Sequence, residues 1–258
     1  MVRKIKNIII NIIEFIEDLV YNRVSIFCTI WFNFHYLPFQ QAIHLPIYLH
    51  RPQFYNIAHR RSSVFTLKGY VKIESSEVRR GMIRLGFIKG TSHPDNGFMW
   101  ANLGTVIFKG RCEIAQGCSI RNNAQLVIGN GVRVNSNTKI VCYHYINLGD
   151  EVRISWDCFL MDTNFHCLKE LQSGKKKKPF APIKIGPRCW IAQRCVILNG
   201  VSLSENTIVS TGSILTKRDS FEPYSIVCGS PVQAVSVGKY YRDFDDDIYP
   251  KERYIEND

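Results

Sequence analysis

Aliphatic residues recur at every sixth position in the C-terminal half of the chain. Between residues 185 and 215 these positions hold Ile185, Ile191, Ile197, Leu203, Val209 and Leu215. Four residues after each of the first five stands a small or short side chain: Cys189, Cys195, Val201, Thr207 and Ser213. Such six-residue units are typical of the hexapeptide repeat of a parallel β-helix. The pattern therefore predicts short strands whose aliphatic side chains fill the interior of a prism.

The same hexads occur upstream in groups of three. The groups start at Phe108, Ile128 and Leu148, and the starts are 20 residues apart. Three six-residue faces make one triangular coil, and the two extra residues fit at a corner. Coils stacked about 4.8 Å apart place each strand beside its equivalent in the next coil. Five cysteines occupy the small position of a hexad, where we expect buried hydrophobic side chains: Cys112, Cys118, Cys158, Cys189 and Cys195.

The hexads divide the chain into three parts. Residues 1–70 lack them, and isoleucines at helical spacing near the start predict a helix in a helical or irregular N-terminal segment. Residues 71–232 are predicted to form the β-helix, beginning with an atypical coil. Within it, residues 166–183 break the phase and are expected to protrude as a loop. Residues 233–258 are rich in Asp and Glu and are expected to form an acidic tail.

The 258-residue chain is basic, and its charge changes the picture of its partners. Its 33 Lys and Arg exceed its 22 Asp and Glu, for a formal net charge of +11, which indicates an anionic ligand, polymer or membrane surface. Residues 24–50 lack charged side chains, but polar residues and prolines interrupt them, so no membrane span is expected. Nine cysteines without a CxxC pair favour reduced thiols and a cytoplasmic setting. Peripheral contact with the inner face of the membrane stays open.

Segments of the C-terminal half resemble the hexapeptide-repeat acyltransferases. They read PIKIGPRCWIA from Pro182, then VILNGVSL, TGSILTK and YSIVCGSP. The maltose, galactoside and xenobiotic O-acetyltransferases share this half, and residues 31–46 and 155–166 look like a surface-polysaccharide branch. The resemblance covers about residues 30–235. It implies an all-β-dominated, left-handed parallel β-helix, a homotrimer with active sites between subunits, acetyl-CoA as donor and a histidine as base. The handedness comes from the resemblance, since the spacing does not fix it.

By this resemblance His166 matches the catalytic histidine. A sugar hydroxyl attacks a thioester slowly unless a base removes its proton, and the ordinary pKa of a histidine, near 6.5, suits that task. We therefore predict His166 as the general base. Asp162, four residues earlier, either orients the imidazole or makes a local corner turn. Asn164 stands where similar polysaccharide enzymes often carry Asp, and it is a candidate for binding the acceptor.

Two asparagines one coil earlier are further candidates for the acceptor. Asn135 and Asn137 match an Asn-x-Asn feature with which the sugar and xenobiotic branch holds its acceptor. Alternatively, asparagine is used there because it tolerates the left-handed backbone of a corner. That branch also has an acidic pair where this chain has Cys142 and Tyr143. Acceptor recognition therefore does not transfer in detail.

The resemblance also suggests a place for the donor. It puts acetyl-CoA along the coils that carry Ala192, Ser210, Thr216 and Lys217. Lys217 and Lys239 either meet the CoA phosphates as compact point charges or are solvated cations. Trp190 is expected beside the cofactor or acceptor, or in a subunit contact. The four lysines at 175–178 form either a solvated loop or a site for an anionic glycan, a lipid-linked diphosphate or a headgroup surface.

The predicted function is acetyl-CoA-dependent O-acetylation of a saccharide, in surface polysaccharide or lipopolysaccharide assembly. A serine or amino-sugar N-acetyltransferase and a non-catalytic β-helix that binds anions or serves as a scaffold are the alternatives. A metalloenzyme of similar fold would use His144 and His166, but a catalytic zinc usually takes three protein ligands, so no metal is expected. The basic residues are dispersed and match no recognition motif, so no nucleic acid is expected.

Overall fold

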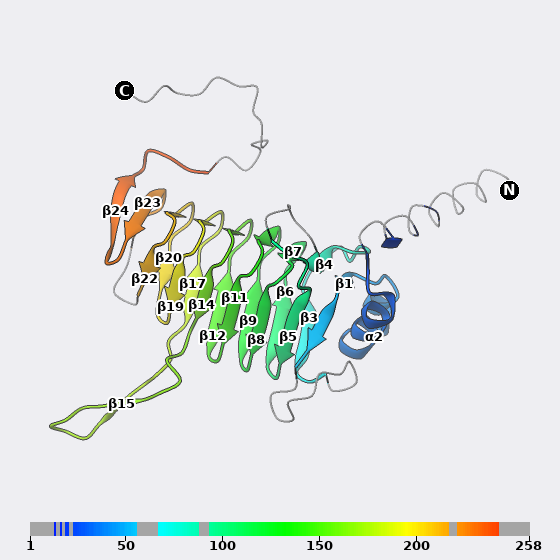
Figure 1. The fold of residues 1–258 in the computed structure, drawn as a ribbon, viewed down its shortest axis with the longest axis horizontal. Coiled ribbons are helices and arrows are strands. Elements are labelled where there is room, and N and C mark those ends of the chain that lie inside the picture. Colours follow the sequence, from blue (N-terminus) through cyan, green and yellow to red (C-terminus); the bar gives the residue numbers. More distant parts are fainter. Residues whose placement is uncertain are drawn as a thin grey trace.

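Almost all regular structure in the described part of the chain is β-strand, wound into a three-sided prism (Figure 1). The computed structural model describes residues 13, 16, 19, 20, 23–55, 67–87, 93–216 and 221–242. The helix expected near the start of the chain lies largely outside these residues, and so does most of the acidic tail expected over 233–258. The prism has three long sheets, here called A, B and C, and each coil of the chain adds strands to them in that order. Within each sheet the strands pair in parallel, except for the last pair of sheet A, which is antiparallel.

The three sheets are the faces of the prism. Sheet A contains β1 (Ile47–Leu49), β4 (Ile83–Phe87), β7 (Cys112–Ala115), β10 (Val132–Val134), β13 (Arg153–Ile154), β18 (Trp190–Ile191), β21 (Ile208–Val209), β23 (Ser225–Gly229) and β24 (Val232–Val237). Sheet B contains β2 (Pro52–Phe54), β5 (Phe98–Asn102), β8 (Ser119–Asn122), β11 (Lys139–Cys142), β14 (Phe159–Met161), β19 (Val196–Leu198) and β22 (Ile214–Leu215). Sheet C contains β3 (Tyr70–Ile73), β6 (Thr105–Phe108), β9 (Gln125–Ile128), β12 (Tyr145–Leu148), β17 (Ile183–Ile185) and β20 (Ser202–Leu203).

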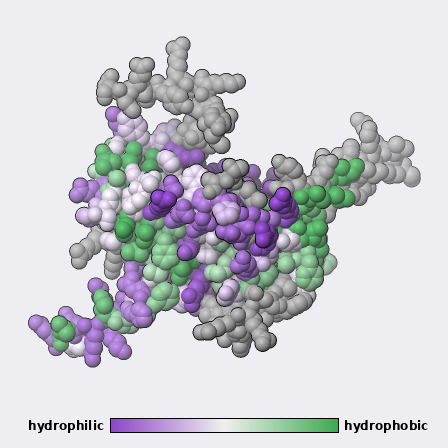
Figure 2. Space-filling model, viewed as in Figure 1, coloured by the Kyte–Doolittle hydropathy of each residue, from purple (hydrophilic) through white to green (hydrophobic). Residues whose placement is uncertain are grey.

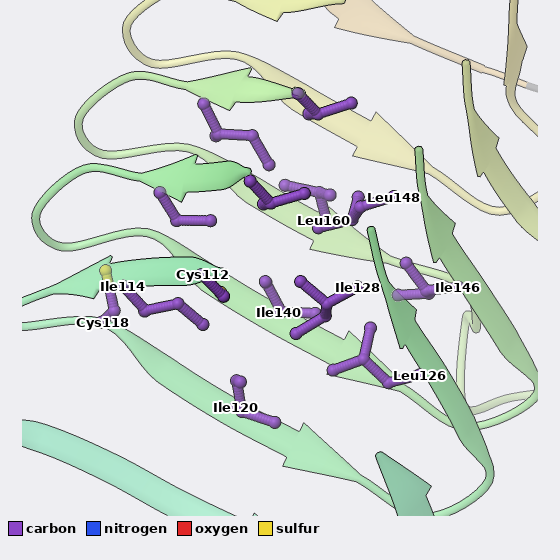
Figure 3. Close-up of a cluster of buried hydrophobic side chains, with 14 of the residues drawn as sticks. Cys112, Ile114, Cys118, Ile120, Leu126, Ile128, Ile140, Ile146, Leu148 and Leu160 are labelled. Atoms are coloured by element: carbon purple, nitrogen blue, oxygen red, sulfur yellow. The ribbon is translucent and has the colours of Figure 1, made fainter. Parts of the chain in front are cut away.

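The aliphatic residue of each hexad points into the prism, as predicted. In sheet B, Ile120, Ile140 and Leu160 are aligned in register and are at most 1% exposed. Figure 3 shows these residues beside Ile128 and Leu148 from sheet C in one continuous core. Burying one such side chain contributes about 1.5–3 kcal/mol. The expected class, a strand-dominated left-handed parallel β-helix, agrees with this architecture.

The hexad cysteines are buried, as predicted, and their thiols bond to the corners of the prism. The Cys118 thiol donates to the Asn135 carbonyl at 3.1 Å, and the Cys158 thiol donates to the Ala192 carbonyl at 3.1 Å. All five are at most 2% exposed. A small side chain at this position therefore fills the corner and satisfies a backbone carbonyl.

The prism starts earlier than the hexads indicate. The boundary expected at residue 71 moves to β1, because β1 and β2 pair in parallel with β4 and β5. Helix α2 (Ile26–Tyr36), followed by the short α3 (Phe39–Ala42), packs against this first coil. The side-chain amide of Asn33 donates to the Ile47 carbonyl at 2.7 Å and accepts from its N–H at 3.1 Å. The helix thus takes the place of a preceding coil.

One side of α2 leaves apolar side chains on the surface. Ile26, Phe27, Ile30 and Phe34 are between 44% and 61% exposed. Figure 2 shows hydrophobic side chains gathered at this end of the molecule. None of the helices in the described ranges is both long and apolar enough to cross a membrane.

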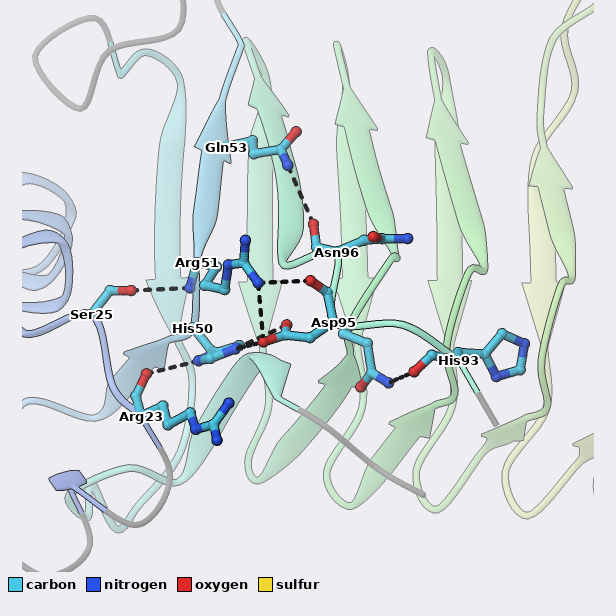
Figure 4. Close-up of polar contacts among 9 residues, drawn as sticks. Arg23, Ser25, His50, Arg51, Gln53, His93, Asp95 and Asn96 are labelled. Atoms are coloured by element: carbon cyan, nitrogen blue, oxygen red, sulfur yellow. Dashed lines mark hydrogen bonds and ion pairs between the residues drawn. The ribbon is translucent and has the colours of Figure 1, made fainter. Parts of the chain in front are cut away.

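A partly exposed carboxylate ties the first coil to the following loop (Figure 4). The Asp95 carboxylate is 3.0 Å from Nε2 of His50 and 3.3 Å from Nη1 of Arg51. Burial alone would raise the pKa of Asp95, but the hydrogen bonds from His50 and Arg51 outweigh it and hold that pKa below its ordinary value.

Replacing Asp95 by Asn is expected to destabilise the fold by about 1 kcal/mol at pH 7. A carboxyl whose pKa is lowered by folding stabilises the fold above its unfolded pKa, about 3.9, and loses that contribution as the pH falls through the folded value. Urea unfolding of the wild type and Asp95→Asn at pH 7 and near pH 3 checks this. The gap between the two proteins should narrow at the lower pH, and an equal gap at both pH values would contradict the assignment.

Candidate active site

A β-hairpin leaves the prism between sheets B and C. After β14 the chain forms β15 (Leu168–Lys169) and β16 (Lys176–Lys177), which pair antiparallel, and it re-enters the prism at β17. Figure 1 shows this hairpin projecting from the prism. The break in the hexad phase is therefore an insertion at the B–C corner, the edge where sheet B turns into sheet C.

The base of the hairpin is fixed by backbone bonds and ring contacts. The N–H of Asn164 donates to the Pro179 carbonyl at 2.7 Å. The ring of Phe180 lies 4.8 Å from that of His144, between centroids. The Phe165 ring similarly meets Tyr143 at 4.9 Å. The corner of the preceding coil thereby sets the direction in which the hairpin leaves.

A cavity of about 420 Å³ opens at this base, and His166 lies on its wall. Asn164 and Thr216, both predicted site residues, line the same cavity. Asn199 also lines it, although sequence reasoning did not select it. The signal that could have found Asn199 is its place in the VILNG segment, at the B–C corner of the coil that follows the insertion.

His166 is exposed, and its backbone N–H donates to the Asn164 carbonyl at 2.7 Å. Its imidazole makes no side-chain hydrogen bond within the described part of the chain. Either ring nitrogen is thus open to a substrate in the cavity. An imidazole so placed can take a proton from a hydroxyl and pass it to a leaving group.

Of the two roles expected for Asp162, the contacts of its carboxylate fit the corner turn. Its carboxylate is fully buried and accepts the backbone N–H groups of Tyr143 at 2.7 Å, His144 at 2.8 Å and Tyr145 at 2.8 Å. These three donors belong to the B–C corner of the preceding coil. Asp162 therefore closes that corner, which was the alternative that the sequence left open.

Asn135 and Asn137 lie away from His166 within one chain. They occupy the A–B corner between β10 and β11, whereas His166 follows the B–C corner. Asn137 has φ of +62°, in the left-handed region that asparagine tolerates. The corner interpretation thus fits Asn137, and a single chain does not bring these residues into the His166 cavity.

The predicted cofactor residues divide between two edges. Among those that the structure describes, Thr216 alone lines the cavity with His166. Trp190 and the buried Ala192 belong to sheet A and the A–B corner, and the Trp190 indole donates to Oγ of Ser155 at 3.2 Å. Ser210, at the same corner one coil later, accepts at its carbonyl from the Ser213 hydroxyl at 2.6 Å.

Of the two lysines predicted to bind the donor, the structure describes Lys239. Lys217 lies outside the described residues. Lys239 is exposed, and its ammonium lies 5.0 Å from the ring centroid of Tyr240, far along the chain after β24. Lys239 does not line the His166 cavity, whose described lysines are Lys177 and Lys178 of the hairpin.

His144, the other histidine considered for a metal, packs on Phe180. Within the described ranges, no three His, Cys, Asp or Glu side chains gather so as to hold a metal ion.

Sequence comparison gives the chain its relatives. Galactoside O-acetyltransferase of Escherichia coli (strain K12) is 30% identical over 130 residues, which are 50% of this chain and 61% of that protein. The chain is thus similar in sequence to acetyltransferases. The chain spans about 60% of the length of this relative. No protein-family model matches the chain.

Two solved structures are similar to the chain at lower sequence identity. The polySia specific acetyltransferase NeuO has a TM-score of 0.46 and 16% identity, over 70% of this chain and 76% of that chain. A maltose O-acetyltransferase from Clostridium difficile 630 has a TM-score of 0.33 and 19% identity, over 48% of this chain and 65% of that chain.

Proposed function

We propose that the chain transfers an acetyl group from acetyl-CoA to a hydroxyl of a saccharide, in the assembly of a surface polysaccharide. The observation that carries the proposal is an exposed histidine in a cavity at the hairpin base, in a chain related to galactoside O-acetyltransferase. Asn164 and Asn199 add amide groups that can hold sugar hydroxyls, and Lys177 and Lys178 add positive charge.

The proposed mechanism uses His166 as a general base and then as a general acid. A ring nitrogen of His166 takes the proton of the acceptor hydroxyl while the hydroxyl oxygen bonds to the thioester carbonyl carbon. The carbon–sulfur bond then breaks, and His166 returns the proton to the departing sulfur. The products are the O-acetylated saccharide and CoA. Acetyl-CoA supplies the activated acetyl group, and Lys177 and Lys178 suit its phosphates as point charges.

The proposal includes a homotrimer. Asn135 and Trp190 lie on or beside sheet A, away from the His166 cavity of the same chain. They contribute to the reaction if the A–B edge of one copy faces the hairpin base of another. Light scattering of the purified protein tests this part, and a monomer that is fully active would overturn it.

Calorimetric titration with acetyl-CoA tests the proposal, followed by CoA release with a panel of acceptors. The panel contains galactosides, oligosaccharides, serine and amino sugars, so that O- and N-acetylation are told apart. We expect acetyl-CoA binding and CoA release with a saccharide hydroxyl. A folded protein that does not bind acetyl-CoA would overturn the proposal and favour the scaffold alternative, and release only with amines would favour the N-acetyltransferase.

A further inference from the structure

A row of outward-facing side chains, three of them arginines, crosses the strands of sheet A. The outward positions of β4, β7, β10, β13 and β18 are paired in register, and they hold Arg84, Glu113, Arg133, Arg153 and Trp190. At about 4.8 Å per strand step, the row runs for roughly 19 Å. The row runs from the first coils of the prism to Trp190. The guanidinium carbon of Arg242 lies 5.6 Å from the centroid of the Trp190 ring.

Arginines from the neighbouring C–A corner widen this row into a groove. A cavity of about 350 Å³ covers the first four strands of the row, and its wall includes Arg79, Arg80 and Arg111. Six arginines and two glutamates line it, with no lysine and no aromatic residue. Figure 2 shows hydrophilic side chains gathered along the edge of the prism near β4 and β7. We call these lining residues the arginine groove.

The two glutamates of the groove form ion pairs with arginines, and Glu77 beside the groove pairs with Arg79, but the six arginines still leave the groove positive. Glu113 is 3.5 Å from Arg133, and Glu151 is 2.9 Å from Arg153. Arg133 and Arg153 are themselves direct neighbours across two strands. Like charges placed opposite one another destabilise a sheet. Burial, together with the charges of Arg133 and Arg242, lowers the pKa of Arg153.

Part of the groove is built rigidly. The Arg153 side chain is only 14% exposed, and its guanidinium donates to the Gly131 carbonyl at 2.5 Å as well as to Glu151. Arg133 is half exposed beside it. A fixed guanidinium next to exposed ones suits repeated anionic groups, because its planar fork binds a carboxylate or phosphate through two hydrogen bonds.

We propose that the arginine groove binds an acidic glycan chain and leads it along sheet A to the catalytic centre between copies. The inference rests on the proposed function, since it names the charge of the saccharide acceptor. The carboxylates of successive sugars would meet the exposed guanidinium groups of the groove, and the chain would pass Trp190 at the end of the row. These exposed groups belong to Arg79, Arg80, Arg111 and Arg133.

The shape and chemistry of the groove favour an acidic glycan over other anions. Coenzyme A carries its phosphates at one end of a long neutral arm, whereas the arginines of the row are spread from β4 to β13. Single-stranded nucleic acid binds through aromatic platforms that stack with its bases, and the groove wall contains none. Carboxylates spaced along a glycan need only the guanidinium groups that are present.

The test measures binding of oligogalacturonate, a carboxylate-bearing glycan, by calorimetry without any acetyl donor. Neutral galacto-oligosaccharide is the uncharged counterpart. The variant Arg111→Gln/Arg133→Gln removes two exposed charges from the groove, and Arg79→Gln/Arg80→Gln removes two others. The matched control, Lys139→Gln/Lys184→Gln, removes two outward charges from sheets B and C. Thermal unfolding and light scattering show whether each variant keeps its fold and assembly.

We expect each arginine pair variant to raise the Kd for oligogalacturonate about tenfold or more, because each loses charge-assisted hydrogen bonds. The lysine control should stay close to wild type, and added salt should weaken wild-type binding. Unchanged affinity in both arginine variants, equal binding of the neutral glycan, or tighter binding of a single-stranded RNA would overturn the proposal. So would a loss of assembly in the arginine variants, which would make the groove a subunit contact.

The outcome separates this inference from the proposed function. Groove-dependent binding without CoA release from any acceptor would refute the acetyltransferase proposal and leave the acidic-glycan site standing. CoA release with a neutral saccharide, without binding of oligogalacturonate, would refute the groove alone.

Discussion

Replacing His166 by alanine is expected to lower kcat for acetyl transfer by about 10²–10⁴-fold, the usual contribution of a positioned general base. The affinity for acetyl-CoA should change little, because binding of the donor does not need the proton transfer. His166 lies on the cavity wall with its imidazole open to a substrate, so its removal takes away the base and leaves the cavity. Initial rates of CoA release, measured beside calorimetric titration, check both parts.

The control for this variant is His44→Ala, which removes another exposed histidine far from the hairpin, in the turn before β1. Its rate should match the wild type. Added imidazole should restore part of the activity of His166→Ala, since a free base can enter the vacated space. Full kcat in His166→Ala would contradict the assignment of the base.

Replacing Asp162 by alanine is expected to lower the free energy of unfolding by roughly 3 kcal/mol or more. Three backbone N–H groups lose their acceptor, and each buried, unsatisfied donor costs about 1–3 kcal/mol. Asp162→Asn should fall between the wild type and the alanine variant, because its amide keeps one acceptor oxygen. Urea unfolding of the three proteins measures the series.

Asp150→Ala is the matched control, because Asp150 also sits at a corner but is exposed and accepts one N–H, that of Asn130 at 2.8 Å. We expect it to cost about 1 kcal/mol or less. If Asp162→Ala were as stable as the wild type and had lost kcat, the carboxylate would act through His166 and its structural role would be refuted.

Most of the prism could be predicted because each hexad carries its own signal. Inward apolar residues recur in groups of three hexads from Phe108 to Leu160, and at six-residue steps again from Ile185. The first coil escaped this reasoning because its segment lacks the hexad pattern, and among the described residues β1 and β2 are the first strands of their sheets. Contacts with α2 take the place of a preceding coil, and long-range contacts of this kind leave no periodic trace in a sequence.

The candidate site was predictable only in part. The phase of the hexads explains why Asn135 and His166, both predicted site residues, lie on different edges of the prism. Asn135 follows the hexad of Val134, which belongs to sheet A, whereas His166 follows that of Leu160, which belongs to sheet B. Residues that follow different hexads of a coil lie on different edges, so the separation was already encoded. The role of Asp162 was not, because the donors to its carboxylate could be an imidazole or the backbone N–H groups of a corner.

The arginine groove also had a trace in the sequence. Arg84, Arg133 and Arg153 each directly precede an inward aliphatic residue on sheet A, so they had to face outward on one prism face. Net charge alone did not show this, because it does not tell where the charges gather. Only the register of the strands places the guanidinium groups in one row.

The buried cysteines are natural probes of local opening in successive coils of the prism. Burial raises the pKa of Cys118 and of Cys189 to about 12 each, and a thiol reacts as its thiolate, so an alkylating reagent has to wait for local opening. Because each coil contacts only its neighbours, such openings are expected to spread inward from the ends of the stack. The order in which successive thiols become labelled would then show which end frays first, without any introduced probe.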